Sequence, residues 1–306
     1  MKGATDQEAD VVAITDPADL HWAVVCEQLH LTKCTVIRFN LADLRDMRFV
    51  THAGCLHLRL GGRSYVVSSK TYVWWRRPGS VDASGFDDEE ARLAYDEGPH
   101  LLLGALEQVG VRMVDHPYVA ARSEIKLLQL AIARRLGITV PATLVTNDPD
   151  SARVFAARHK IVAKAVSPGL GIAPYVAEVL DHELDALKAL PTMLQELVPA
   201  SADLRVVVVG NDSWVWRRGR EPGTVDWRQT DPEGSGFLLI ANDEVGASAC
   251  EIAAALGLSI SIQDWLETDS GLVFLESNAQ GAWLFLRGSQ EVVAPAIARH
   301  LRVGHA

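Results

Sequence analysis

Short apolar runs alternate with amphipathic segments along the first third of the chain. Apolar residues at helical spacing predict helices over 17–31 and 87–109, and Gly61-Gly62 predicts the turn of a hairpin. Strand-like runs lie at 11–15, 35–40, 72–78 and 111–115. Strands that alternate with helices in this way are typical of an α/β layer with a largely parallel sheet.

The rest of the chain has a different pattern, rich in strands and turns. Ser123 is the expected start of a helix that Gly137 ends, and a later helix is expected over 243–257. Further strands are expected at 160–166, 192–198, 204–209, 213–218 and in a final hairpin over 259–279. This pattern indicates an antiparallel α+β region. Boundaries near 117 and 195 predict three parts, 1–116, 117–195 and 196–306.

Composition narrows the class of protein. The chain has 306 residues, 48% of them hydrophobic and 22% charged, as in folded globular proteins. The formal net charge of -10 argues against nucleic acid or an anionic membrane as a partner held by bulk electrostatics. The four cysteines are scattered and the N-terminus has no apolar signal segment. We therefore expect a cytoplasmic protein with reduced thiols and no membrane partner.

The final hairpin contains acidic residues inside apolar runs. A three-residue loop over 269–271 would pair Thr268 with Leu272 and Asp264 with Glu276. Asn278 would share their face. Apolar residues expected on that face are Ile262, Leu266, Leu272 and Phe274.

Facing carboxylates repel each other, and a divalent cation would remove the conflict. Two acids and an amide suit Mg²⁺ that also binds substrate phosphates. The alternative is a register slip of one residue, which would place the acids on a solvated edge.

Several other segments carry residues that suit anions. Lys164 ends a strand and precedes the glycine-containing loop 167–171, which suits a phosphate but also an ordinary surface turn. Asp203 and Arg205 are expected on one face of a strand. Arg228 lies in a polar loop near Arg217, Arg218 and Arg220, where a guanidinium could bind phosphate or carboxylate. Solvated surface charge is the alternative for most of these side chains.

The order of these features resembles the ATP-grasp ligases. The motifs are Lys126, Lys164 with its glycine loop, "QELV", "DLR", "DWR", Asp264 and "FLESNAQG". Within that superfamily the chain is similar to the branch of the ribosomal-protein glutamate ligase. The finer resemblance is to the microviridin-type (graspetide) maturases of ribosomal peptides, through "VWWRRP", "PATLVTND" and the "FLESNAQGAW" ending. The resemblance implies a Rossmann-like N-terminal domain, a central lid and a C-terminal domain with an antiparallel sheet.

The resemblance also implies roles for individual residues. Lys126 and Lys164 would contact the phosphates of ATP, and Asp203 would hold the ribose. Backbone groups of Gln195, Glu196, Leu197 and Val198 would bind the adenine. The ligands of Mg²⁺ would be Asp264, Glu276 and Asn278, the same three that the hairpin register proposes. Arg205 and Arg228 would hold the transferring phosphate or the incoming carboxylate.

Two positions depart from the family pattern. The chain has Asn278-Ala279-Gln280-Gly281 where the family usually has "NPxG", and Trp75 where it usually has Tyr. The residues Trp74 to Arg77 are expected either to face a peptide substrate or to form a strand core with a solvated arginine pair.

The implied function is an ATP- and Mg²⁺-dependent carboxylate–amine or carboxylate–hydroxyl ligase that acts through an acyl phosphate. Its expected substrate is an acidic precursor peptide, in which it would form side-chain amide or ester cross-links. The alternatives are a ligase of small amino acids or dipeptides, and a non-catalytic peptide-binding subunit. Family members are often dimers, so a homodimer is a further expectation.

Overall fold

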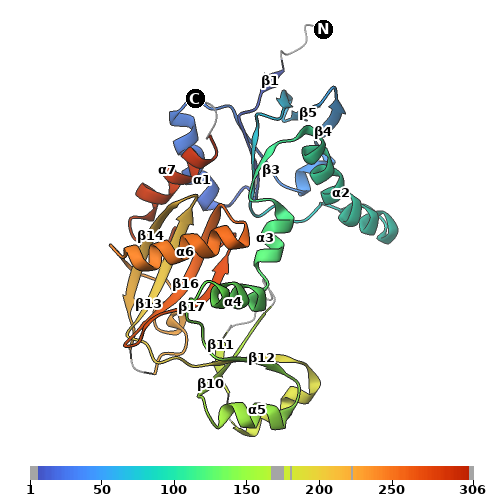
Figure 1. The fold of residues 1–306 in the computed structure, drawn as a ribbon. Helices are drawn as coiled ribbons and strands as arrows, with labels where there is room; N and C mark the ends of the chain where they lie inside the picture. Colours follow the sequence, from blue (N-terminus) through green and yellow to red (C-terminus); the bar gives the residue numbers. More distant parts are fainter. Residues whose placement is uncertain (1–5, 167–175, 180, 222, 303–306) are drawn as a thin grey trace. The chain divides into compact units, whose positions relative to one another are not determined.

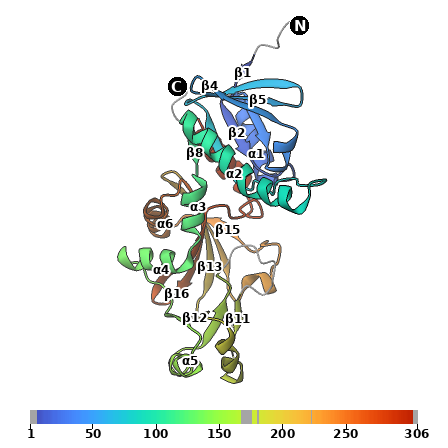
Figure 2. The same ribbon diagram turned by 90° about the vertical axis from the view of Figure 1, so that its right-hand side faces the viewer.

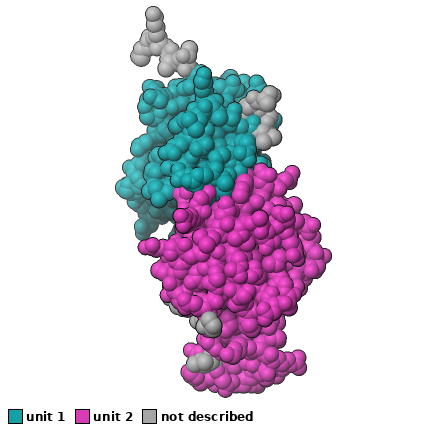
Figure 3. All heavy atoms as spheres, turned by 90° about the vertical axis from the view of Figure 1, so that its left-hand side faces the viewer, with its two compact units in different colours: residues 1–118, 289–306 teal, residues 119–288 magenta. Residues whose placement is uncertain are grey.

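The computed structural model describes residues 6–166, 176–179, 181–221 and 223–302. The chain divides into two units: residues 1–118 with 289–306, and residues 119–288 (Figure 3). The second unit contains most of both predicted later parts, whereas the C-terminal segment from 289 belongs to the first unit. The division into three domains stays a prediction.

The first unit is built on the expected parallel sheet. Its strands β2 (Val11–Ile14), β3 (Val36–Phe39), β7 (Tyr72–Trp75) and β8 (Arg112–Val114) follow the order β3-β2-β7-β8, and every pair is parallel. The helices of this unit are α1 (Leu20–Leu31), α2 (Asp88–Val109) and α7 (Ser289–His300), and α7 packs on α1 (Figure 1). The alternation of strands and helices predicted this layer correctly.

A second sheet in the first unit contains the expected hairpin. Strands β5 (Cys55–Leu60) and β6 (Arg63–Val67) are joined by the glycine pair, both of whose glycines have positive φ. Two strands that the pattern did not predict extend it, β1 (Gln7–Glu8) and β4 (Arg48–His52), in the order β1-β6-β5-β4. The short 3-10 helix η1 (Ala42–Arg45) precedes β4.

The "VWWRRP" segment is largely internal. Trp74 and Trp75 are both buried, because both faces of a parallel sheet are covered. Arg76 is only 1% exposed, and its Nε donates to Asp19 Oδ2 at 2.7 Å. Arg77 alone is exposed. The expectation of a solvated arginine pair was therefore wrong for Arg76.

The helix expected from Ser123 is present but starts a few residues later, and an unpredicted helix precedes it. α3 (Pro117–Ser123) ends where that helix was expected to begin, and the Ser123 hydroxyl donates to Ala120 O at 2.7 Å. α4 (Lys126–Arg135) then starts after Ile125. A serine can satisfy the end of one helix as well as the start of another, so the sequence signal was ambiguous.

A small antiparallel sheet follows in the second unit. It has the order β11-β10-β12-β9 and packs α5 (Pro149–Ala156) and the 3-10 helix η2 (Asp181–Ala189) around a core that includes Leu184 and Leu194. Its strands are β9 (Thr143–Thr146), β10 (Ile161–Lys164), β11 (Val176–Glu178) and β12 (Thr192–Glu196). This sheet brings Lys164 to the end of β10.

A five-stranded antiparallel sheet forms the larger part of the second unit. Its strands, in the order β15-β14-β13-β16-β17, are β13 (Ala202–Val209), β14 (Asp212–Gly219), β15 (Leu238–Ile240), β16 (Ile260–Thr268) and β17 (Gly271–Asn278). Helices α4 and α6 (Asp243–Leu256) cover one face (Figures 1 and 2). The core under them includes Leu204, Val206, Val208, Trp265 and Phe274. We call this the helix-covered face.

The final hairpin pairs Asp264 with Glu276, as predicted, but its register near the turn differs from the predicted one. Near the turn Thr268 pairs with Gly271 and Trp265 with Phe274, one residue away from the expected register. An irregularity between Asp264 and Trp265 then restores the predicted pairing. A β-bulge of this kind is not visible in a pattern of alternating residues.

Because of this bulge, Phe274 and Leu272 pack on the helix-covered face rather than beside Asp264. The prediction for these two residues was wrong, although the acidic pair was placed correctly. In the described part of the chain, no helix is long and apolar enough to cross a membrane.

Candidate functional site

Charged side chains occupy the face of the five-stranded sheet opposite to α4 and α6. Along β13, Leu204 and Val206 face the helices, so Asp203 and Arg205 point the other way. Arg205 is paired in register with Asp264, which is itself paired with Glu276. We call this side the site face.

Arg205 connects β13, β16 and the segment after β17. Its Nη1 donates to Asp264 Oδ1 at 2.6 Å and its Nη2 to Ala282 O at 3.0 Å. Its buried Nε has no protein hydrogen-bond partner among the described residues. Gly281 makes this approach possible, because a Cβ there would lie 2.9 Å from Ile262 Cβ and 3.3 Å from Arg205 Nη2. The glycine of the "NAQG" sequence is therefore required by close packing.

Two lysines compensate the charge of Glu276. Lys126 Nζ lies 2.5 Å from Glu276 Oε2, and both side chains are mostly buried. Burial by itself raises the pKa of Glu276, but the charges of Lys164 and Lys126, with Arg228, outweigh it and hold that pKa well below its ordinary value. Burial lowers the pKa of Lys164, although Glu276 opposes the change. The structure thus brings together Lys126, Lys164 and Glu276 from α4, β10 and β17.

The predicted metal ligands lie on neighbouring strands. Asp264 and Glu276 are register partners, and Asn278 follows two residues after Glu276, opposite Ile262. Among the described residues, no group of three or more His, Cys, Asp or Glu side chains could hold a metal ion. The candidate set is instead two carboxylates and one amide, which are oxygen donors of the kind that suits Mg²⁺.

The charges of Asp264 and Glu276 are compensated by protein cations. We expected unrelieved repulsion between the two carboxylates, which a divalent cation would remove. In the structure Arg205 is paired with Asp264, and Lys126 with Glu276. The repulsion therefore does not require a metal, and the metal role of the three residues stays a prediction from donor chemistry and resemblance.

Arg228 lies close to the same charges. It is the second residue of the 3-10 helix η3 (Trp227–Gln229), whose N-cap is Asp226, and its Nη1 contacts both Asp226 oxygens at 3.1 and 3.0 Å. Burial lowers the pKa of Arg228, but the carboxylates of Asp264, Asp226 and Glu276 together raise it above its ordinary value. Arg228 therefore stays charged, and a guanidinium is a suitable hydrogen-bond donor to phosphate or carboxylate.

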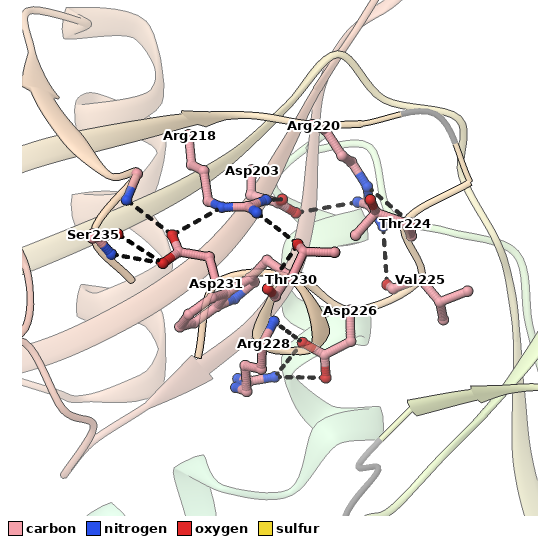
Figure 4. Close-up of polar contacts among 12 residues, drawn as sticks. Asp203, Arg218, Arg220, Thr224, Val225, Asp226, Arg228, Thr230, Asp231 and Ser235 are labelled. Carbon is pink, nitrogen blue, oxygen red and sulfur yellow. Dashed lines mark hydrogen bonds and ion pairs between the residues drawn. The ribbon is translucent and has the colours of Figure 1, made fainter. Parts of the chain in front are cut away.

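Asp203 is engaged by two arginines of β14 and the loop that follows. Its Oδ1 lies 3.2 Å from Arg220 Nη1, and its Oδ2 lies 3.5 Å from Arg218 Nη1 (Figure 4). Arg218 also contacts Asp231 Oδ2 at 3.2 Å. Burial raises the pKa of Asp203, and the two arginines oppose this change. The role of Asp203 at a ribose stays a prediction.

Surface charge was the default interpretation of the arginines around β14, and it was wrong for two of them. The side chains of Arg218 and Arg220 are 9% and 7% exposed. Figure 4 shows how they fix the loop after β14: Arg218 of the strand donates to Thr230 Oγ1, and Arg220 of the loop donates to Asp203 Oδ1 of β13 and to the carbonyl oxygens of Thr224 and Val225. Arg217, which points to the other side, is half-exposed and paired with Glu267. Strand alternation was the signal that could have separated them.

The segment predicted to bind adenine lies at the end of β12. Gln195 is buried, and its Nε2 donates to Thr143 Oγ1 at 3.1 Å. The backbone N–H groups of Glu196 and Leu197 already donate to Ala142 O and Lys160 O. Recognition of adenine by residues 195–198 would therefore use their remaining backbone groups, including those of Val198. The glycine loop 167–171 lies outside the described residues.

Two residues near the site were not predicted from the sequence. Glu124 accepts a hydrogen bond from Ala279 N at 2.8 Å, and Gln129 contacts both backbone groups of Ser277. Both lie beside Lys126 in the sequence. No sequence pattern separates Gln129 from an exposed polar residue of the same helix, because its burial and its contacts with Ser277 are visible only in the structure.

Comparisons with known proteins agree with this fold. No family model matches the chain. A solved RiPP-associated ATP-grasp ligase from Chryseobacterium gregarium, in complex with ADP and a leader and core peptide, superposes with a TM-score of 0.85 at 24% identity, over 96% of both chains. The macrocyclase MdnC from Microcystis aeruginosa, bound to the precursor peptide MdnA, superposes with a TM-score of 0.79 at 20% identity, over 96% of this chain and 99% of MdnC.

Curated sequences match over a shorter stretch. A probable alpha-L-glutamate ligase from Klebsiella pneumoniae is 28% identical over 191 residues, which are 58% of this chain and 62% of that protein. Its counterpart from Photobacterium profundum is 26% identical over 211 residues, 65% of this chain and 70% of that protein. The chain thus spans about three fifths to seven tenths of the length of these two curated relatives.

The fold and the arrangement of charges define the class: the chain has the ATP-grasp fold. The predicted resemblance to ATP-grasp ligases is confirmed: the first solved structure is an ATP-grasp ligase, and the curated sequences are probable alpha-L-glutamate ligases. The two solved structures superpose over nearly the whole chain.

Proposed function

We propose that this protein is an ATP- and Mg²⁺-dependent ligase that joins carboxylates to amines or hydroxyls within a precursor peptide. The observation that carries the proposal is the convergence of four cations on a facing pair of carboxylates. Lys126, Lys164, Arg205 and Arg228 all interact with Asp264 or Glu276 on the site face. The ATP-grasp fold supports the interpretation of these charges as a site for ATP and Mg²⁺.

The cations fit the phosphates of a nucleotide. Lys126 and Lys164 come from different elements and share Glu276 as a counter-ion. The cost of burying Lys164 lowers its pKa, and an anionic ligand would restore the preference for the charged form. These two lysines are therefore suited to hold phosphate oxygens.

The carboxylates and the amide fit a magnesium ion. Asp264, Glu276 and Asn278 would supply oxygen ligands while phosphate oxygens and water complete the coordination. A bound Mg²⁺ would neutralise the charge of the transferring phosphate. Arg205 and Lys126 would then have to share their carboxylates with the ion.

The reaction balances without a protein nucleophile. A substrate carboxylate oxygen attacks the γ-phosphorus of ATP, which forms an acyl phosphate and releases ADP. An amine or hydroxyl then attacks the acyl carbon, inorganic phosphate leaves, and the attacking group loses a proton. The protein contributes positioning and charge neutralisation. Arg205, whose Nε has no protein partner among the described residues, and Arg228 are suited to orient the incoming carboxylate.

Two of the proteins that share the fold over nearly the whole chain support a peptide as the substrate. The Chryseobacterium ligase was solved with a leader and core peptide, and MdnC with a precursor peptide. An acidic precursor peptide, modified in the cytoplasm, is therefore the proposed partner. A homodimer remains an expectation from the resemblance.

Release of ADP tests this proposal. The purified protein is incubated with ATP, Mg²⁺ and either an acidic leader–core peptide or a mixture of free amino acids. ADP release with the peptide alone, with loss of one water mass per bond formed, is the expected result. Release with amino acids alone would assign the protein to small-molecule ligation, and release in neither reaction would refute both ligase functions for these substrates.

The similarity to probable alpha-L-glutamate ligases favours one second candidate. In that function the same site would activate a free or terminal carboxylate and add an amino acid. Successive mass increases of one amino-acid residue, instead of losses of water, would identify it.

A further inference from the structure

The strand that carries Glu276 and Asn278 lies at the edge of its sheet. β17 is the last strand in the order β15-β14-β13-β16-β17. Outward-pointing backbone groups on such a strand need partners from elsewhere. At Ser277 one side chain supplies both: Gln129 Nε2 donates to Ser277 O at 2.6 Å, and Gln129 Oε1 accepts from Ser277 N at 3.0 Å. Gln129 therefore replaces a neighbouring strand at this residue.

The amide of Gln129 is itself held in place. The side chain is 1% exposed, and Nε2 makes a second hydrogen bond to Ser123 O at 2.6 Å. Two carbonyl oxygens and one N–H fix which end of the amide is nitrogen. Burying such a group costs free energy unless it is hydrogen-bonded, and here both ends are.

Glu124 makes a second contact with the same stretch of backbone. Its Oε1 accepts from Ala279 N at 2.8 Å. Burial raises the pKa of Glu124, and the Ala279 hydrogen bond and the charge of Lys126 oppose this change. Glu124 and Gln129, which we call the edge clamp, hold residues 277 and 279, one on either side of Asn278.

Ser277 is also held from inside the sheet. Its hydroxyl is 2.8 Å from the hydroxyl of Ser261, and both residues are buried. Because side chains alternate along a strand, Glu276 and Asn278 point to the face opposite to Ser277. The bulge beside Asp264 means that regular pairing does not by itself fix this register. A slip of one residue would turn both side chains away from the site face.

We propose that the edge clamp positions Glu276 and Asn278 for metal and nucleotide, with Gln129 as the principal positioning residue. The proposal rests on the proposed function, because it assumes that these two side chains bind a metal–nucleotide complex. The contacts of the clamp that carry the proposal are hydrogen bonds to the backbone of residues 277 and 279. Each acts on the backbone that carries the ligand residues.

The test measures binding rather than turnover. Free Mn²⁺ is titrated by electron paramagnetic resonance with saturating ADP, for the wild type and for Gln129→Met, which at similar volume removes both hydrogen bonds to Ser277 and the one to Ser123. About a tenfold weaker Mn²⁺ affinity is the expected result. Asn242→Ala, which removes the N-cap of α6 in the same unit, is the control for general loosening and should bind as the wild type does.

A second pair of variants covers the case in which Gln129→Met does not fold. Glu124→Gln keeps an oxygen that can accept from Ala279 N, whereas Glu124→Leu removes it. We expect Glu124→Gln to bind Mn²⁺ within about twofold of the wild type and Glu124→Leu to bind severalfold more weakly. This pair separates the hydrogen bond from the charge of the carboxylate.

Two outcomes would overturn the proposal. One is wild-type Mn²⁺ affinity in both folded Gln129→Met and Glu124→Leu. The other is an equal loss in Asn242→Ala, which would assign the effect to stability. Failure of the proposed function would look different: the wild type would bind no Mn²⁺ with ADP, or it would bind the complex but release no ADP with either substrate.

Discussion

The two faces of the five-stranded sheet are made by the same strands but have different tasks. On the helix-covered face, residues such as Leu204, Val206 and Phe274 pack against α4 and α6. On the site face, Arg205 and Glu276 alternate with them and are paired to other charges. Each strand therefore contributes to stability at one residue and to a charged site at the next. Changes to the two faces should affect different measurements.

The largest expected effect on the site face comes from Glu276→Gln. This change keeps the shape but removes the negative charge shared by Lys126 and Lys164, so ATP turnover should fall by about 10²–10³-fold or more while the fold survives. Turnover is measured by ADP release and the fold by circular dichroism. Glu267→Gln is the control, because Glu267 lies on the same sheet but pairs with half-exposed Arg217. Full activity of Glu276→Gln would remove it from the site.

On the helix-covered face, Phe274→Ala should act on stability. Phe274 is fully buried and packs against Trp265, so its truncation should cost about 3–5 kcal/mol in the free energy of unfolding. Denaturant unfolding measures this change. The fraction that stays folded should retain its affinity for nucleotide. Loss of affinity without loss of stability would break the division between the two faces.

Arg228→Ala should have a smaller and more selective effect. Arg228 is partly exposed and lies in the field of Asp264 and Glu276, without belonging to the sheet. Turnover should fall by about 10–100-fold, whereas ATP affinity measured by calorimetry should change little. The reverse pattern would place Arg228 at the nucleotide instead of the incoming carboxylate.

The smallest expected effect is on the dependence of stability on pH. The pKa of Glu276 is lower in the folded state than in the unfolded chain, so its ion pairs stabilise the protein fully above the unfolded value. That contribution should be lost as the pH falls below about 4.5 towards the folded pKa. Glu276→Gln should have a flatter unfolding free energy over this range. Identical pH profiles would show that Glu276 is not held ionised by its neighbours.

The sequence predicted the larger features of the fold because they depend on local periodicity. The parallel sheet of the first unit and the pairing of Asp264 with Glu276 were both expected and are both present. The bulge next to Asp264 was not predicted. The predicted register is wrong by one residue near the turn, and the bulge shifts the pairing by one residue, so the two errors cancel at Asp264 and Glu276. Alternation reports which residues share a face only while the pairing stays regular.

The site was predicted less completely than the fold, because ion pairs between distant segments leave little local signal. Lys126 and Glu276 are 150 residues apart in the chain. The burial of Arg218 depends on Asp203 and Asp231, which belong to other segments. Gln129 resembles any polar residue of a helix until its contacts with Ser277 are known.

The most direct test of the account is the effect of Mg²⁺ on nucleotide binding. The affinity for ADP is measured by calorimetry with and without Mg²⁺, for the wild type, Asp264→Asn and Glu276→Gln. We expect Mg²⁺ to strengthen binding to the wild type by about tenfold or more, and each variant to lose most of this gain. An equal gain in all three proteins would contradict the assignment of the metal–nucleotide site to this face of the sheet.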